Sequence, residues 1–262
     1  MKNIYVTFKY KMCQKDVRFV VLLIKNTLTM KYKSSIIGAF AILLFFSCAT
    51  NPFTGKKTMA FPGTENSTLF PTAFAQYDQF LTENEIVKGT KDAEMITRVG
   101  QRIAVAAERW LNANGYEGYL KDYKWEYNLV NDKTVNAWCM PGGKIVFYTG
   151  ILPIAANETG VAAIMGHEVA HALANHGQQR MSAAYVQAGI ALAGNGLIED
   201  EESRNIFNQS FGVGSSVLGM LPFSRSHETQ SDKIGLRLMA IAGYNPDEAA
   251  ELWKRMKANS GG

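Results

Sequence analysis

The stretch His167-Glu168-Val169-Ala170-His171 decides how the rest of this sequence is interpreted. In a helix, two histidines four positions apart lie on one face, one turn apart, and their side chains can converge. That spacing suits two nitrogen ligands of one Zn²⁺ ion. Glu168 would lie beside the metal without ligating it, where it can accept a proton from water. The alternative is an accidental match, in which two core histidines are satisfied by hydrogen bonds.

The residues around this stretch favour a buried helix over residues 158–175. They are rich in alanine and large apolar residues, contain no proline, and repeat apolar positions at intervals of three and four. Asn157 is of the residue type that caps a helix N-terminus. Two histidines on a buried helix would be costly to dehydrate without partners, which favours a metal site.

The composition predicts one globular domain and argues against nucleic-acid binding. Of the 262 residues, 47% are hydrophobic, enough for a substantial core. The net charge is +4, but residues 1–47 hold eight Lys or Arg and one acidic residue. The remaining residues carry 22 acidic and 19 basic residues, so no basic surface for nucleic acid is expected there.

The amino terminus has the pattern of a bacterial lipoprotein signal. A short basic segment from Met30 to Lys33 precedes the apolar run 34–46, and Ser47 then precedes Cys48. We expect residues 1–47 to be a signal peptide, with Met30 as a better start than Met1. Cys48 would be lipidated, and residues 48–63 would form a tether on a periplasm-facing lipoprotein of the outer membrane. An uncleaved membrane anchor is the alternative, although 13 apolar residues are short for one.

The rest of the chain predicts helices around a small sheet. Three short strands joined by turns indicate an antiparallel sheet just before the histidine helix, at residues 123–130, 135–140 and 144–149. Further helices are expected at 67–81, 92–114, 224–242 and 246–258. Two Gly- and Ala-rich runs, 183–198 and 211–223, are interpreted as a helical pair packed behind the site, or else as a membrane-surface contact. Cys139 is expected to be a buried thiol.

A catalytic zinc site takes three protein ligands, and the histidine motif alone does not identify the third. His176 is one residue out of register for a third histidine, and we expect it merely to end the helix. Glu228 and Asp232 lie four apart on a second helix, so both face one way. Glu228 could ligate the metal while Asp232 orients a ligand histidine, unless the two form a solvated acidic face. His227 points elsewhere.

The sequence resembles metallopeptidase family forty-eight, which includes the CAAX prenyl endopeptidases, the bacterial heat-shock membrane protease and the mitochondrial Oma protease. The resemblance covers about residues 49–258 and is greatest to the periplasmic lipoprotein branch. Beyond the histidine motif, the residues that carry it are Asn136-Ala137-Trp138, Pro141-Gly142-Gly143-Lys144-Ile145, Thr149-Gly150, Ser224-Arg225, Glu228 with Asp232, and Ala242-Gly243-Tyr244-Asn245-Pro246. The order of these motifs is highly specific to the family.

This resemblance implies an α+β, mainly helical zincin-type domain over residues 64–262, with one Zn²⁺ held by His167, His171 and Glu228. It implies that Glu168 is the general base and Asp232 supports a ligand. It also implies that the segment Asn136, Ala137, Trp138 and Cys139 is an edge strand that pairs with an extended polypeptide substrate.

The expected function is therefore a zinc endopeptidase that hydrolyses unfolded or extended envelope proteins in quality control. The group that stabilises the oxyanion is open, with Arg225 and His227 as candidates. One alternative is a zinc-containing lipoprotein that binds envelope proteins as an adaptor with little proteolysis. Another is a structural lipoprotein without metal.

Overall fold

A computed structural model describes residues 47–55, 57–60, 64–188, 201–211 and 225–259. The chain divides into residues 1–46 and residues 47–262, and only the second unit contains described residues. The signal peptide predicted for residues 1–47 therefore lies almost entirely outside the described part. Within the described residues, no helix is both long and apolar enough to cross a membrane.

The second unit begins with a two-stranded hairpin, β1 (Ser47–Thr50) and β2 (Lys57–Ala60). Its turn is attached to the helical body, because the Asn51 amide donates to the carbonyl oxygen of Ala174 over 3.3 Å. The Phe53 ring also stacks on Trp110 with centroids 4.2 Å apart. The segment expected to be a tether therefore includes a folded hairpin, and lipidation of Cys48 in β1 stays a prediction.

A four-stranded sheet forms the centre, in the order β3-β4-β6-β5. Its strands are β3 (Ile86–Val87), β4 (Glu126–Val130), β5 (Ala137–Met140) and β6 (Lys144–Tyr148). The β5–β6 hairpin is antiparallel, but β6 lies between β5 and β4 and runs parallel to β4. The prediction of a purely antiparallel sheet was therefore wrong, because hairpin signals do not reveal which strand inserts beside β4.

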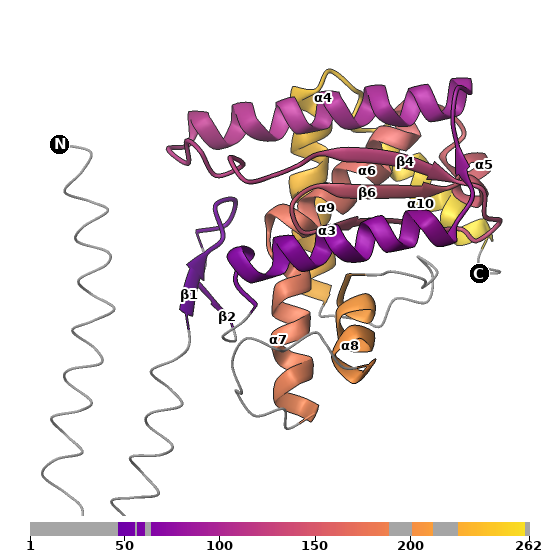
Figure 1. The fold of residues 1–262 in the computed structure, drawn as a ribbon. Helices are drawn as coiled ribbons and strands as arrows, with labels where there is room; N and C mark the ends of the chain where they lie inside the picture. Colours follow the sequence, from indigo (N-terminus) through magenta and orange to yellow (C-terminus); the bar gives the residue numbers. More distant parts are fainter. Residues whose placement is uncertain (1–46, 56, 61–63, 189–200, 212–224, 260–262) are drawn as a thin grey trace, which may run out of the picture. The chain divides into compact units, whose positions relative to one another are not determined.

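Helices cover the two faces of this sheet (Figure 1). On one face lies α3 (Asn66–Glu83), whose Tyr77 hydroxyl donates to the Ile145 carbonyl over 3.3 Å. On the other face lie α4 (Lys91–Ala113) and α6 (Glu158–Leu173), which share one hydrophobic core with Ile145 and Phe147. A 3₁₀ turn (Thr149–Ile151) and the short α5 (Leu152–Ala155) lead from β6 into α6.

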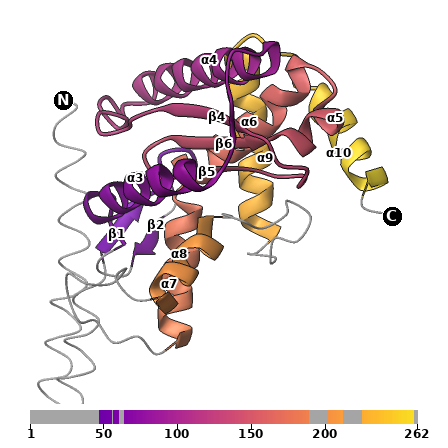
Figure 2. The same ribbon diagram turned by 45° about the vertical axis from the view of Figure 1, so that its right-hand side comes forward.

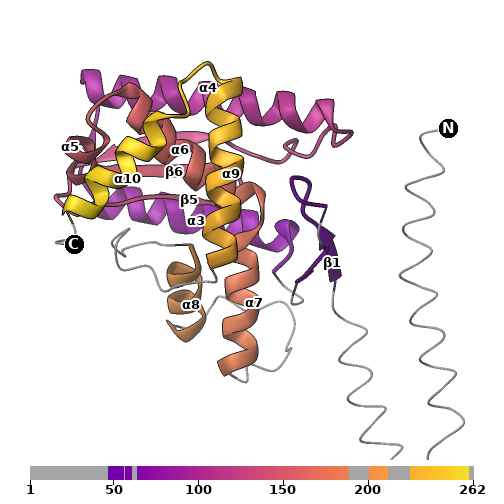
Figure 3. The ribbon, with the colours of Figure 1, turned by 180° about the vertical axis from the view of Figure 1, so that it is seen from behind.

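The remaining helices are α7 (His176–Ala188), α8 (Glu201–Phe211), α9 (Arg225–Ile241) and α10 (Glu248–Asn259). Of these, α7, α9 and α10 pack on α6, whereas α8 packs on α7 and β5. Figures 2 and 3 show α9 and α10 alongside α6, on the side away from the sheet. The expected helices at 67–81, 92–114, 224–242 and 246–258 are confirmed to within a few residues. The Gly- and Ala-rich runs lie largely outside the described residues, apart from the end of α7, and α8 was not predicted.

Candidate metal centre

The histidine motif lies on a buried helix, as its sequence predicts. The side chain of Asn157 caps α6 by accepting a hydrogen bond from the Gly160 backbone N–H over 2.9 Å. His167 and His171 are one turn apart and only 7% and 5% exposed. Their Nε2 atoms face each other at 3.1 Å. Two unprotonated imidazole nitrogens at this distance would repel unless a cation or a proton lay between them, so the arrangement is that of a ligand pair.

Helix α9 brings a carboxylate to this pair because two glycines let it approach α6 closely. An added Cβ on Gly235 would lie 2.9 Å from the His167 backbone nitrogen, and one on Gly166 would lie 3.0 Å from the Gly235 oxygen. Glu228 lies on α9 two turns before Gly235. Its carboxylate oxygens are 3.4 Å from Nε2 of His167 and 3.6 Å from Nε2 of His171.

These three side chains satisfy the geometric requirements of a zinc site. Their ligand atoms lie within 4.8 Å of one another, and no other such group occurs among the described residues. Ligands of tetrahedral zinc at about 2.0–2.1 Å stand about 3.3 Å apart. The two imidazole nitrogens are 3.1 Å apart, and each lies near a different oxygen of Glu228, at 3.4 Å from His167 and 3.6 Å from His171. Two imidazole nitrogens and one carboxylate are also the donor set of known catalytic zinc sites.

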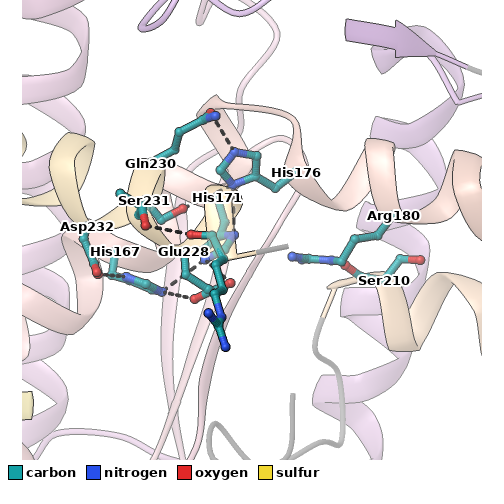
Figure 4. Close-up of polar contacts among 11 residues, drawn as sticks. His167, His171, His176, Arg180, Ser210, Glu228, Gln230, Ser231 and Asp232 are labelled. Carbon is teal, nitrogen blue, oxygen red and sulfur yellow. Dashed lines mark hydrogen bonds and ion pairs between the residues drawn. The ribbon is translucent and has the colours of Figure 1, made fainter. Parts of the chain in front are cut away.

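The outer nitrogen of His167 is held by Asp232, as expected from the sequence. Nδ1 of His167 donates to the Asp232 carboxylate over 2.9 Å, and Figure 4 shows this contact on the side away from Glu228. The hydrogen bond leaves the Nε2 lone pair for a metal. Burial alone would lower the pKa of His167, but Asp232 and Glu228 outweigh it and raise the pKa to about 10 in the absence of metal.

The outer nitrogen of His171 is held by a residue whose role sequence reasoning missed. His176 does not end α6 but begins α7, because Asn175 adopts a left-handed conformation with φ of 57° and redirects the chain. The His176 ring is fully buried, and its Nδ1 lies 3.1 Å from Nδ1 of His171. Its Nε2 faces the side-chain oxygen of Gln230 at 3.3 Å, and Ser231 Oγ lies 3.2 Å from Nδ1 (Figure 4).

One proton arrangement satisfies this chain of contacts when Nε2 of His171 faces a metal. Nδ1 of His171 then carries the proton and donates to Nδ1 of His176. Nε2 of His176 must in turn carry a proton, which it donates to Gln230. Burial lowers the pKa of both His171, to about 4, and His176, to about 2, so both rings are neutral.

Glu168 is buried beside the ligand pair, and burial raises its pKa to about 7. A half-buried cation, Arg180 of α7, interacts electrostatically with Glu168 and Glu228, and its Nε donates to the Ser210 carbonyl of α8 over 2.6 Å. Sequence reasoning missed Arg180, since nothing local marks it. His227 lies outside the ligand group, as expected: its ring stacks on His176 at 4.2 Å.

The predicted substrate strand occupies the expected place, but its side chains point inward. Strand β5 lies at one edge of the sheet. Asn136, Ala137, Trp138 and Cys139 are all buried, and Trp138 lies edge-on to the rings of Tyr77 and Phe80. Cys139 is a buried free thiol, as predicted, and burial raises its pKa well above the ordinary value. Only the backbone of this strand can therefore pair with another chain.

Comparison with known proteins identifies the family. A sequence profile described as Peptidase family M48 matches residues 92–260. The chain belongs to peptidase family M48. Members depend on zinc, so the group of His167, His171 and Glu228 is the candidate zinc site. The expected α+β fold and zinc cofactor are confirmed at this level.

Several curated relatives share part of this chain. It is 37% identical over 142 residues to the mitochondrial metalloendopeptidase OMA1 of Schizosaccharomyces pombe, which covers 54% of this chain and 40% of the relative. OMA1 of Arabidopsis thaliana is 29% identical over 187 residues, an alignment that covers 68% of this chain and 37% of the relative. The beta-barrel assembly-enhancing protease of Escherichia coli is 25% identical over 123 residues, an alignment that covers 45% of this chain and 25% of the relative. The chain thus spans less than half the length of each.

Proposed function

We propose that this protein is a zinc-dependent endopeptidase. The observation that carries the proposal is the convergence of Glu228, from α9, on the two imidazoles of α6, with Glu168 buried next to them. A purely structural zinc site fills all four positions with protein ligands and has no use for a neighbouring carboxylate. Here the described residues supply three ligand groups and a separate base.

His167 and His171 would hold Zn²⁺ through Nε2, and Glu228 through its carboxylate. When bound, the metal supplies Lewis acidity, which polarises a peptide carbonyl and acidifies water. Glu168 accepts a proton from the attacking water and delivers it to the leaving amine, a general acid–base role worth about 10²- to 10⁴-fold in rate. Asp232 and His176 keep the two imidazoles oriented.

The substrates of this proposal are unfolded or extended polypeptides that add to the edge of the sheet. β5 is the last strand of the sheet, and the unpaired backbone N–H and C=O groups of an edge strand can recruit a peptide main chain with little demand on its sequence. The position of β5 supports this mode, because Cys139 lines a small cavity together with His171 and so lies next to the candidate metal site.

The proposed location is the bacterial envelope, on a lipid at Cys48 after removal of residues 1–47, with a role in quality control of envelope proteins. The signal-like sequence before Cys48 supports the location, and the similarity to the beta-barrel assembly-enhancing protease of Escherichia coli supports the role. Mass spectrometry of the mature protein tests the location: a diacylglycerol-modified Cys48 at the N-terminus is expected, and an unmodified N-terminus at Met1 or Met30 would contradict it.

The activity is tested by comparing wild type with Glu168→Gln, which keeps the shape of the side chain but cannot accept the proton. Both should bind one zinc per chain, and only wild type should degrade casein, in a reaction that a chelator stops and Zn²⁺ restores. Full casein cleavage by Glu168→Gln would refute the base assignment. Zinc-bound wild type that binds casein without cutting it would instead support the adaptor function.

A further inference from the structure

Arg180 of α7 brings a positive charge to the candidate zinc site. Its side chain is half-buried, and it interacts electrostatically with the carboxylates of Glu168 and Glu228. Figure 4 shows the side chain extending from α7 toward the side on which Glu228 and His171 lie. Arg180 and His171 also line one small cavity. The charge of Arg180 therefore acts on the metal centre.

The guanidinium group of Arg180 is held through only one of its nitrogens. Nε donates to the Ser210 carbonyl oxygen of α8 over 2.6 Å, which restrains the orientation of the group. Among the described residues, Nη1 and Nη2 make no hydrogen bond, and no carboxylate lies close enough to Arg180 for an ion pair. Arginine groups inside proteins are usually paired. The remaining N–H groups are thus available to a ligand that carries negative charge.

The charges of the metal centre explain why such a cation is needed. In the ionised state that a general base requires, Glu168 joins Glu228 and Asp232 as a third carboxylate around the site. Together these carboxylates exceed the charge of a divalent metal by one, and Arg180 cancels the excess. Attack of water on a peptide adds a further negative charge, on the carbonyl oxygen. Inside a protein this charge is strongly disfavoured unless a cation or oriented donors lie nearby.

Arg180 also lies beside the strand proposed to hold the substrate. The cavity that Arg180 shares with His171 is lined by Cys139 of β5 as well. This cavity has room for about 10 Å³, which is at most one water. The space on this side of the metal centre therefore suits a backbone oxygen and excludes a side chain.

The two groups that the sequence offers for binding the oxyanion are placed less favourably. Arg225 is exposed at the first residue of α9, so water and salt screen its charge. The His227 ring stacks on His176, and its Nε2 lies 3.1 Å from the side-chain oxygen of Gln179. Arg180 has neither disadvantage, because it is half-buried and its terminal nitrogens are unpaired.

We propose that Arg180 is the oxyanion-binding residue of this peptidase. As the water oxygen bonds to the peptide carbon, Glu168 takes the proton, and the π electrons of the carbonyl bond move onto the carbonyl oxygen. The terminal N–H groups of Arg180 donate hydrogen bonds to that oxygen, and these bonds strengthen as its negative charge grows. The inference rests on the proposed peptidase function and adds a catalytic residue to it.

Substitution of Arg180 tests its effect on turnover. Arg180→Gln removes the charge but keeps an amide that can donate to Ser210, and Arg180→Lys keeps the charge without the planar fork. We expect kcat for a peptide substrate to fall about 10²- to 10³-fold in Arg180→Gln, with KM changed about threefold at most. Arg180→Lys should recover part of this loss.

Arg204→Gln, at an exposed arginine on α8, is the matched control and should keep the wild-type kcat. If Arg180→Gln does not fold, Arg180→Met, of similar length and without charge, gives the same comparison. A wild-type kcat in the folded variant would overturn the proposal, as would a loss confined to KM.

A binding experiment separates oxyanion binding from a structural role and requires no cleavage. A phosphonate peptide, whose charged oxygens stand where the oxyanion would form, is titrated into zinc-loaded protein in a calorimeter. Arg180→Gln should bind it about 100-fold more weakly than wild type does, with unchanged zinc affinity and melting temperature. This difference would support the inference even if wild type cut no peptide. Equal phosphonate affinities, or a loss of zinc affinity that accounts for the whole difference, would overturn it.

Discussion

The two sides of the candidate zinc site differ in how they hold their histidine. On the His167 side, the Asp232 side chain is 42% exposed, and a cavity of about 390 Å³ adjoins the ring. On the His171 side, His176 and Ser231 are completely buried, and the cavity there has room for at most one water. One side is open and holds its histidine through a carboxylate, and the other is closed and holds its histidine through a neutral imidazole.

This difference indicates that the two sides of the metal centre have different roles. A charge-assisted hydrogen bond such as that to Asp232 is strong, but water can replace an exposed partner. The neutral contact to His176 is weaker, yet nothing can replace it inside the protein, because a buried polar group without a partner is costly. We infer that the closed side fixes the geometry of the metal centre, whereas the open side tolerates substitution.

The largest expected effect comes from breaking both sides at once with Gly235→Ala. The added methyl group would press on the His167 backbone, so α9 must move away from α6 and carry Glu228 and Asp232 with it. We expect a loss of about 1–3 kcal/mol in the free energy of unfolding and more than 100-fold in zinc affinity. Urea unfolding and chelator competition measure the two.

Lys233→Ala, at an exposed position on the same helix, is the control for this substitution and should change neither quantity. Gly166→Ala should be milder, because its nearest contact is 3.0 Å and the neighbouring atoms can yield slightly. An unchanged zinc affinity in Gly235→Ala would show that the close crossing of α6 and α9 does not position Glu228.

The closed side is tested by His176→Phe, which keeps a ring but removes both nitrogens. The Nδ1–H of His171 would then be buried without its partner, and we expect zinc affinity to fall about 100-fold, the upper end for residues that support metal ligands. His176→Asn restores an acceptor near the Nδ1 position and should recover part of the loss. Equal affinities for Phe and Asn would show that the hydrogen bond is irrelevant.

The open side is tested by Asp232→Ala, for which a smaller loss of about tenfold is expected. Water can reach the position left by this half-exposed carboxylate and accept the hydrogen bond from His167. Zinc affinity measured by the same competition assay gives the comparison. A larger loss of zinc affinity for Asp232→Ala than for His176→Phe would contradict the claim that the closed side fixes the geometry.

The smallest effect is expected far from both sides, at the N-terminus of α6. Hydrogen bonds from Arg98 and Tyr244 hold the pKa of Glu158 below its ordinary value of 4.5. A lowered pKa stabilises the folded state above about pH 4.5, and the benefit is lost as the pH falls through the folded-state value. Glu158→Gln should therefore lower the melting temperature at pH 7 by about 2 °C at most, with a smaller effect as the pH falls below 4.5 and no change in zinc affinity.

The sequence predicted those parts of the site that depend on spacing along one helix. The i, i+4 relation of His167 with His171 and the cap at Asn157 came from spacing and residue type, whereas the choice of Glu228 with Asp232 over a solvated acidic face rested on the family resemblance. It did not predict that Gly166 and Gly235 touch, because close approach of two helices is a tertiary property.

Two further features were missed because tertiary context decides them. The residues around His176 have the pattern of a helix end. The left-handed backbone conformation of Asn175 directs His176 back toward His171. The position of β6 between β4 and β5 likewise follows from packing on α4 and α6, since alternation identifies strands but not their order.

X-ray absorption at the zinc edge of the metal-loaded protein tests the central claim most directly. We expect one zinc per chain, coordinated by two imidazole nitrogens at about 2.0–2.1 Å, with oxygen atoms as the remaining ligands. Glu228→Ala should keep both imidazoles and lose one oxygen. A single imidazole, or sulfur at about 2.3 Å, would contradict a site built from His167, His171 and Glu228.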